Sequence, residues 1–285
     1  VSLTSLVAFQ GVFADPMAQT GLGFFAMSWL GLIYLHCQSM DTPNQLRPAL
    51  RRALGDDYRS DIPTERQQVL CDDIVTRQWI KPFHFKRPGV RQHNHIAYSD
   101  GGKRNLLDIY QPLEPREGGF PVLLQVHGGA WMIGEKEQQG KPLMYHMAQR
   151  GWLCVAINYR LSPKAAFPAH IIDVKKAIAW IKEHIEDYGG NPDYIAITGG
   201  SAGGHLSALA ALTPNRAEWQ PGFEENDTTV QAAVPFYGVF DFLDRNGIRP
   251  GMSMEDMLAD RVMQCKRAEN PELWDAGSPL SHIRE

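Results

Sequence analysis

The sequence predicts a three-layer α/β fold, in which a mostly parallel β-sheet is covered by helices on both faces. Three observations predict it. From about residue 79 onward, short apolar segments alternate with segments of helical pattern. The apolar segments have turn-forming residues on both sides, as expected of strands buried on both faces. This alternation requires crossover connections between parallel strands, and the helical segments supply them.

The strands are expected at the apolar segments. Residues 94–98 and 105–110 flank Asp100-Gly101-Gly102, a turn suited to a hairpin. Further strands are expected at residues 121–126, 152–158, 194–198 and 232–236.

Three helices are expected between these strands. Residues 141–150 have helical composition and stop at Gly151. The clearest pattern is a set of apolar residues spaced by three and four, which are Ile171, Val174, Ile178, Ile181 and Ile185. A third helix is expected from about Ala202 to Leu212.

The N-terminal part differs from the rest in composition. Residues 1–40 are expected to form an apolar helical region, residues 41–78 a linker with short helices, and residues 79–285 the α/β domain. The uncharged segment 22–37 falls slightly short of the roughly 20 apolar residues that span a bilayer. The alternatives are association with a membrane, a buried helix, or a lid over an active site. The expected location is therefore either membrane-associated or cytoplasmic.

Charge and cysteine content argue against several function classes. The formal net charge is −4, and nucleic-acid binding requires clustered Lys and Arg, so no nucleic-acid partner is expected. The four cysteines, Cys37, Cys71, Cys154 and Cys265, lack the close spacing of zinc sites and redox dithiols. Neither a zinc site nor a redox dithiol is therefore expected, and the oligomeric state is left open.

The strongest chemical signal is the segment 199–204, GGSAGG, placed directly between a predicted strand and a predicted helix. A nucleophilic serine must leave the sheet on a sharp turn, with small residues two positions before and after it. Gly199 and Gly203 satisfy this requirement for Ser201. The alternative of a glycine-rich phosphate loop would need GxGxxG or a following Lys-Ser/Thr, and neither is present.

The second signal is the segment 127–131, HGGAW, at the end of a predicted strand. Acyl transfer requires amide donors for the oxygen that becomes negative in the tetrahedral intermediate. We predict that the backbone N–H groups of Gly128, Gly129 and Ala202 form this oxyanion hole. His127 is expected to brace the loop, because the base of a triad on this turn follows the serine in the chain.

Together with the segment YRLSPKAAFP and Asp173, these two motifs resemble the hormone-sensitive-lipase-like and bacterial feruloyl/acetylxylan-esterase branches of the α/β-hydrolases. The resemblance covers about residues 94–283. It implies a Ser–His–Asp esterase that acts on a small-molecule ester without a metal or an organic cofactor. Gly200, where many lipase-like members have Asp, favours the carbohydrate-ester branch. HGG with a nearby Trp is also similar to kynurenine formamidases, which are the alternative, and the apolar N-terminal region resembles that of membrane-linked mycobacterial Lip esterases.

Other candidate acids and bases are assigned structural roles. Asp173 precedes Ser201 in the chain, so pairing with Arg160 or capping its helix is expected. The resemblance implies that Asp241 shapes the rim of the pocket. His205 lies four residues after Ser201 and is expected to pack in the interior.

The resemblance also implies further strands that carry the triad acid and base. The sequence reaches Glu285 without them, and His282 is the only histidine after His205. No residue of this chain is therefore assigned as the triad Asp or His, and the fold is expected to lack its last strands. A serine without a base keeps only about 10³–10⁴-fold catalysis over water. The two hypotheses are a fragment of an active esterase, which we favour, and a truncated, inactive hydrolase-fold protein that binds a partner.

Overall fold

The computed structural model describes residues 15–64, 88–248 and 253–283. The chain divides into two compact units, Val1–Arg77 and Gln78–Glu285. The start of the predicted N-terminal region and the predicted domain boundary near residue 79 lie outside the described residues.

The described residues of the first unit form two helices. Helix α2, Pro16–Met40, begins at a capping residue, Asp15, whose side chain accepts a hydrogen bond from the backbone N–H of Met17. None of its residues is buried, and by length and composition it could cross a membrane. Helix α3, Thr42–Leu54, follows it and carries two arginines in its last turn. The predicted apolar helix is confirmed.

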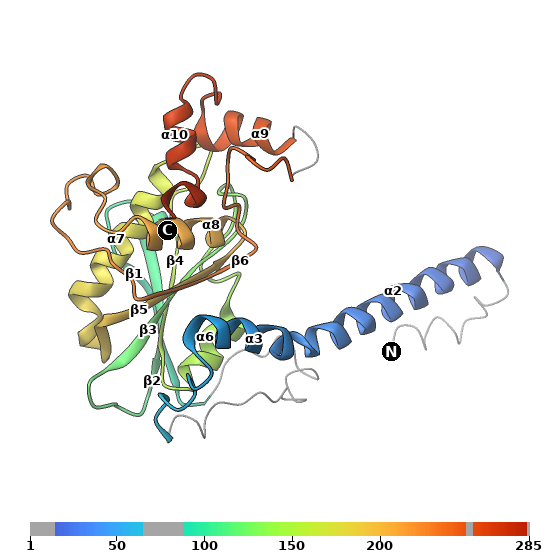
Figure 1. The fold of residues 1–285 in the computed structure, drawn as a ribbon, viewed down its shortest axis with the longest axis horizontal. Helices are drawn as coiled ribbons and strands as arrows, with labels where there is room; N and C mark the ends of the chain where they lie inside the picture. The colour runs from blue at the N-terminus through green and yellow to red at the C-terminus, as the bar shows by residue number, and fades with distance from the viewer. Residues whose placement is uncertain (1–14, 65–87, 249–252, 284–285) are drawn as a thin grey trace. The chain divides into compact units, whose positions relative to one another are not determined.

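The second unit is built on one six-stranded sheet, shown in Figure 1. Its strands are β1 (Val90–Ala97), β2 (Leu106–Pro112), β3 (Phe120–Val126), β4 (Leu153–Ile157), β5 (Gly190–Gly200) and β6 (Ala232–Phe236). Their order across the sheet is β1-β2-β4-β3-β5-β6. The first two pairings are antiparallel, and the pairings of β3 with β4, β3 with β5 and β5 with β6 are parallel.

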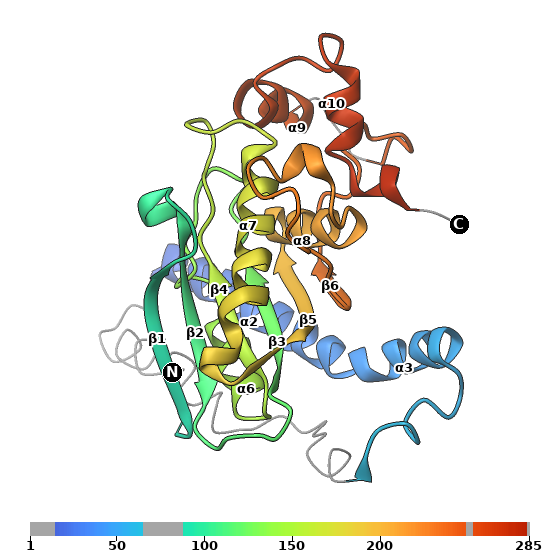
Figure 2. The ribbon, with the colours of Figure 1, turned by 90° about the vertical axis from the view of Figure 1, so that its left-hand side faces the viewer.

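Helices cover both faces of this sheet, as Figure 2 shows. Helix α7 (Ala169–His184) and helix α8 (Ala202–Leu212) pack on one face against the larger apolar cluster. Helix α6 (Lys141–Ala148) packs on the other face through Met144, Tyr145 and Ala148. The predicted three-layer α/β fold is therefore confirmed.

The remaining elements are short. They are the 3₁₀ segments η2 (Gly102–Asn105), η3 (Ile185–Tyr188), η4 (Ala217–Trp219) and η6 (Pro279–His282), the π-helical segment η5 (Leu258–Met263), and the helices α9 (Ser253–Met257) and α10 (Pro271–Ala276). Figure 2 shows α9 and α10 together at one end of the sheet. Backbone hydrogen bonds tie this region to the sheet unit, for example from Phe167 N–H to Val262 O and from Leu280 N–H to Phe240 O.

Candidate active site

Ser201 lies on the sharp turn between β5 and α8. Its backbone has φ 56° and ψ −120°, a conformation that is strained for a residue with a side chain. Its N–H donates to Phe236 O over 3.0 Å, which holds the turn against the end of β6. The side chain is half-buried and does not cap α8. The turn therefore presents the hydroxyl group at the end of the sheet.

The glycines two positions on either side of Ser201 are needed for this turn. A methyl group on Gly203 would lie 2.1 Å from Val126 O, and one on Gly199 would lie 2.5 Å from the same oxygen. These are contacts with backbone atoms, which cannot move aside easily. The spacing of small residues noted in the sequence therefore has a direct steric cause.

The His-Gly-Gly segment lies beside this turn because β3 and β5 are neighbours. Val126, the last residue of β3, pairs with Gly199 in the parallel ladder. A methyl group on Gly128 would lie 3.4 Å from Ser201 Cβ and 2.6 Å from Gly200 O. The structure thus brings together the two motifs that are separated by about seventy residues in the sequence.

The three predicted oxyanion donors differ in their surroundings. The N–H of Gly128 donates to Gln139 Oε1 over 2.8 Å. The N–H of Gly129 has no acceptor among the described residues. Ala202 is the first residue of α8, where the N–H groups of a helix have no intrahelical acceptor. The amides of Gly129 and Ala202 therefore have no hydrogen-bond acceptor among the described residues.

His127 is buried beneath this loop. Its Nδ1 donates to Gly128 O over 2.8 Å, and its ring stacks on Tyr159 with the ring centroids 4.4 Å apart. The Tyr159 hydroxyl donates to His127 O over 2.9 Å. Burial lowers the pKa of His127 to about 4, so its imidazole is neutral at pH 7. The expectation that His127 braces the loop is confirmed.

The side-chain hydrogen bonds of His205 are also made with residues other than Ser201. Its Nδ1 accepts from Trp131 Nε1–H over 3.2 Å, and its Nε2 donates to Gly277 O over 2.7 Å. The ring is fully buried and stacks on Phe242. Burial lowers the pKa of His205 to about 4. The expected packing role is confirmed, and the structure adds that this residue joins three segments of the chain.

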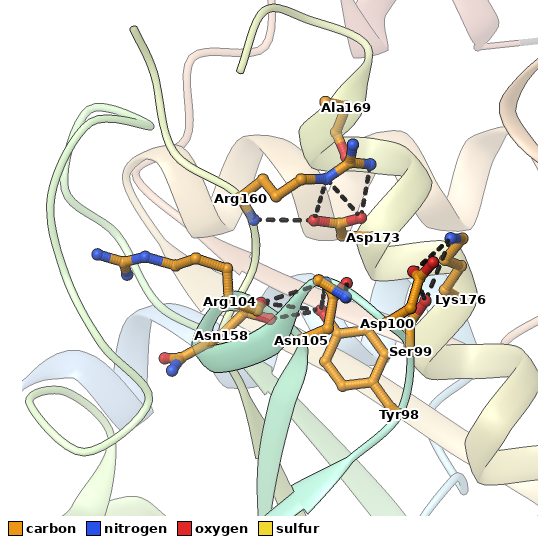
Figure 3. A network of polar contacts seen from close by, with 11 residues as sticks. Tyr98, Ser99, Asp100, Arg104, Asn105, Asn158, Arg160, Ala169, Asp173 and Lys176 are labelled. Atoms are coloured by element: carbon orange, nitrogen blue, oxygen red, sulfur yellow. Dashed lines mark hydrogen bonds and ion pairs between the residues drawn. The ribbon is translucent and has the colours of Figure 1, made fainter. Parts of the chain in front are cut away.

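Asp173 is paired with Arg160, as Figure 3 shows. The guanidinium Nη2 lies 2.7 Å from Asp173 Oδ1, and the backbone N–H of Arg160 donates to Asp173 Oδ2 over 2.8 Å. The carboxylate is fully buried. The predicted pairing is confirmed, and this acid is not available to a catalytic base.

The other two candidates have partners as well. Asp241 accepts from the backbone N–H of Leu243 and from the Arg245 guanidinium, over 3.1 and 2.9 Å. His282 Nε2 donates to Ala276 O over 2.8 Å. Among the described residues, no group of three or more His, Cys, Asp or Glu side chains could hold a metal ion.

Two residues at this site were not found from the sequence. The first is Gln139, whose contact with Gly128 spans eleven residues of loop. The second is Tyr237, which follows β6 with φ 39° and is 81% exposed. A methyl group on Gly200 would lie 2.6 Å from the Tyr237 hydroxyl oxygen. Neither residue belongs to a repeated pattern or a motif, so no signal in one sequence marks them.

A family model named BD-FAE matches residues 107–285 of the chain. Among curated proteins, the chain is 46% identical over 272 residues to the probable carboxylic ester hydrolase LipM of Mycobacterium tuberculosis, which covers 90% of this chain and 60% of LipM. It is 46% identical over 243 residues to the esterase LipQ of the same organism, covering 84% of this chain and 57% of LipQ. The chain thus spans about 60% of the length of these relatives.

Solved esterase structures share the fold. A truncated carbohydrate esterase from gut microbiota is 26% identical with a TM-score of 0.56, covering 68% of this chain and 72% of that chain. A thermophilic esterase from the Planctomycetes species Thermogutta terrifontis is 27% identical with a TM-score of 0.53, covering 69% of this chain and 67% of that chain. The residues matched by the family model, 107–285, include Ser201.

Proposed function

Since this chain belongs to the BD-FAE family of α/β-hydrolases, we propose that the protein hydrolyses small-molecule carboxylic esters through an acyl intermediate on Ser201. The single observation that carries the proposal is the strained turn at Ser201, with the free amide of Gly129 in the neighbouring loop. The ester-hydrolase names of LipM and LipQ support the same reaction class.

In this mechanism, Ser201 Oγ attacks the ester carbonyl carbon while its proton passes to a base. The carbonyl oxygen becomes negative and binds to the amides of Gly129 and Ala202. The alcohol leaves after it is protonated, and water then releases the acid from Ser201. His127, His205 and His282 are each hydrogen-bonded elsewhere, so the proposal assigns the base to none of them.

The amides of Gly129 and Ala202 need no rearrangement during the reaction, because the backbone already holds them in position. An amide aimed at the developing charge typically contributes about 3 kcal/mol to the transition state. Ala202 adds the favourable field at the N-terminus of α8. The N–H of Gly128, the third predicted donor, already donates to Gln139 Oε1.

The test is covalent labelling of the wild-type protein with a fluorophosphonate, followed by mapping of the adduct by mass spectrometry. We expect one adduct on Ser201, and we expect Ser201→Ala to lose both the adduct and the hydrolysis of p-nitrophenyl esters. Ser207 is the matched control, since it is buried in α8 and donates to Gly203 O. An adduct elsewhere, or an active Ser201→Ala variant, would overturn the proposal.

The kind of acyl bond is tested by a substrate panel. p-Nitrophenyl esters of short and aromatic acids are compared with N-formylkynurenine at equal concentration. We expect a higher kcat/KM for the esters. A higher kcat/KM for the formamide would replace the ester assignment by a formamidase with the same nucleophile.

We also propose that the N-terminal unit associates with a membrane. Helix α2 has an uncharged apolar stretch, and large apolar side chains such as Phe24, Trp29 and Leu30 are at least half exposed. Exposed apolar surface of this extent is expected to be covered by lipid or protein. The arginines at the end of α3 are suited to contact with anionic headgroups.

A further inference from the structure

The peptide group between His127 and Gly128 is held from both sides. Its carbonyl oxygen accepts from the Tyr159 hydroxyl over 2.9 Å, and its N–H donates to Gln139 Oε1 over 2.8 Å. Two side chains from different parts of the chain therefore fix one peptide plane. Rotation of this peptide would break at least one of the two hydrogen bonds.

The next peptide group, between Gly128 and Gly129, depends on the first. Its carbonyl oxygen accepts from His127 Nδ1–H, and its N–H is the free donor of Gly129. In a trans peptide the C=O and N–H groups point in opposite directions. The direction of the Gly129 N–H is thus set by two sets of contacts. One is the hydrogen bond from His127 to the carbonyl oxygen of the same peptide group, and the other is the pair of hydrogen bonds that fix the preceding peptide group.

Glycine makes these contacts necessary. Gly128 and Gly129 lack the side chains that restrict backbone rotation, and Gly129 has φ 124°, a conformation that residues with a side chain rarely adopt. A methyl group on Gly129 would lie 2.1 Å from Ile133 O. The loop must therefore contain glycine, and its orientation must come from hydrogen bonds.

Gln139 is itself held in place by the segment before it. Lys136 is 2% exposed, and its Nζ lies 2.9 Å from the buried Asp108 Oδ1. Its backbone N–H donates to Asn158 Oδ1 over 2.7 Å, and Arg104 Nη1 donates to Gly134 O over 2.9 Å. The loop is thereby anchored to the sheet three residues before Gln139, so the amide side chain reaches Gly128 from a fixed base.

We propose that Gln139 is a positioning residue of the oxyanion hole, which holds the Gly128 peptide so that the Gly129 N–H faces the substrate oxygen. This inference rests on the proposed function of Ser201. Gln139 contacts the loop and not the reacting atoms. Its contribution is preorganisation, because donors that are already oriented need no rearrangement as charge develops.

The test compares Gln139→Met with Gln138→Met in the full chain. Methionine keeps the length of glutamine but is only a weak acceptor. Gln138 is the matched control, because it is the exposed neighbour of Gln139 and no side-chain hydrogen bond is described for it. For Gln139→Met we expect kcat to fall by about 10-fold with KM within twofold, which is less than the loss of a direct donor. Gln138→Met should match the wild type.

A second readout measures the loop directly. Amide hydrogen exchange at Gly128, followed by mass spectrometry of short peptides, should accelerate in Gln139→Met and not in Gln138→Met, while the melting temperature of both variants stays near that of the wild type. A change in KM alone, equal kcat in both variants, or a faster Gln139→Met enzyme would overturn the inference. A faster enzyme would identify Gln139 as a competitor of the substrate.

The two proposals fail in different ways. A wild-type protein that neither hydrolyses esters nor reacts with the fluorophosphonate at Ser201 would refute the proposed function. The inference on Gln139 fails when the wild type is active and Gln139→Met keeps its kcat, or when exchange at Gly128 is unchanged.

Discussion

Gly200 and Gly203 lie on the two sides of Ser201 but have different neighbours. A methyl group on Gly203 would lie 2.1 Å from Val126 O and 2.7 Å from His127 O, both backbone atoms. A methyl group on Gly200 would meet the Tyr237 side chain, which is exposed and can move. The same substitution is therefore expected to have different effects at the two positions.

We expect Gly203→Ala to lower the free energy of unfolding by about 3 kcal/mol or more, because the backbone of two elements must move apart. Gly200→Ala should cost about 1 kcal/mol or less, since only an exposed side chain shifts. Urea unfolding followed by circular dichroism measures both. Equal losses for the two variants would show that the turn is not limited by the Val126 contact.

At the residue scale, the sequence identified residues that belong to motifs but not residues that act through tertiary contacts. Ser201, Gly199 and Gly203 form a pattern whose spacing has a steric cause, so the turn was predictable. Gln139 and Tyr237 act through distances to Gly128 and Gly200 that depend on how loops fold back. A single sequence contains no spacing rule for such contacts.

Among the elements, His205 connects three that are distant in the chain. It lies on α8, accepts from Trp131 of the His-Gly-Gly loop and donates to Gly277 after α10. Both hydrogen bonds require the neutral ring with its proton on Nε2. Protonation of Nδ1 would remove the acceptor for Trp131 and leave a buried charge.

The two hydrogen bonds of His205 predict that the free energy of unfolding depends on pH. Burial lowers the pKa of His205 to about 4, below the ordinary value of 6.5. The stabilisation from the neutral ring is complete above pH 6.5 and is lost as the pH falls towards 4, because the unfolded chain then binds the proton more tightly. His205 is expected to contribute a loss of about 3 kcal/mol between pH 7.5 and 4, in addition to the loss from the buried His127.

Urea unfolding of the wild type, His205→Asn and His184→Asn at several pH values measures this effect. His184 is the control, because its side chain is 40% exposed at the end of α7. We expect a flatter pH dependence for His205→Asn and an unchanged one for His184→Asn. Parallel curves for all three proteins would contradict the assignment of the acid loss to His205.

The elements with strong periodicity were predicted well. Helix α8 spans Ala202–Leu212 as expected, and the strand predicted at residues 194–198 is the centre of β5. The start of β5 at Gly190 was missed, because Gly190 and Pro192 are turn-forming residues. In the folded protein Gly190 pairs with Phe120 of β3. Helices α9 and α10 are five and six residues long, too short for periodicity to mark them.

At the scale of the whole molecule, the helical character of α2 was predictable but its surroundings were not. Its apolar composition left three alternatives, which were association with a membrane, a buried helix and a lid over an active site, and no residue of α2 is buried. The fold class of the sheet unit was equally accessible, because strand and helix patterns alternate through it. The order of the strands in the sheet could not be predicted, since it depends on which crossover connections pack best.

The proposed membrane association gives a further prediction. In flotation with vesicles of zwitterionic and anionic phospholipids, the wild type should rise with the lipid. Leu30→Lys with Ile33→Lys places two charges among exposed apolar residues in the middle of α2. The expected fall in partitioning is at least 100-fold, because each lysine at a helix centre costs about 3 kcal/mol in a bilayer.

The control is Gln38→Lys with Ser39→Lys, which adds the same charge at the polar end of α2. It should float like the wild type. Equal loss in both variants would assign binding to net charge, and a wild type that stays with the soluble fraction would remove the membrane proposal.

The positive φ of Ser201 lowers the stability of the fold at the same residue that supplies the reactive hydroxyl group. Glycine would adopt that backbone without strain, so a library of variants ranked only by heat tolerance should enrich Ser201→Gly while it discards the reactive hydroxyl. A selection for higher melting temperature must therefore be combined with a selection for catalytic turnover. A substitution of Ser201 that raises the melting temperature is expected to remove the activity.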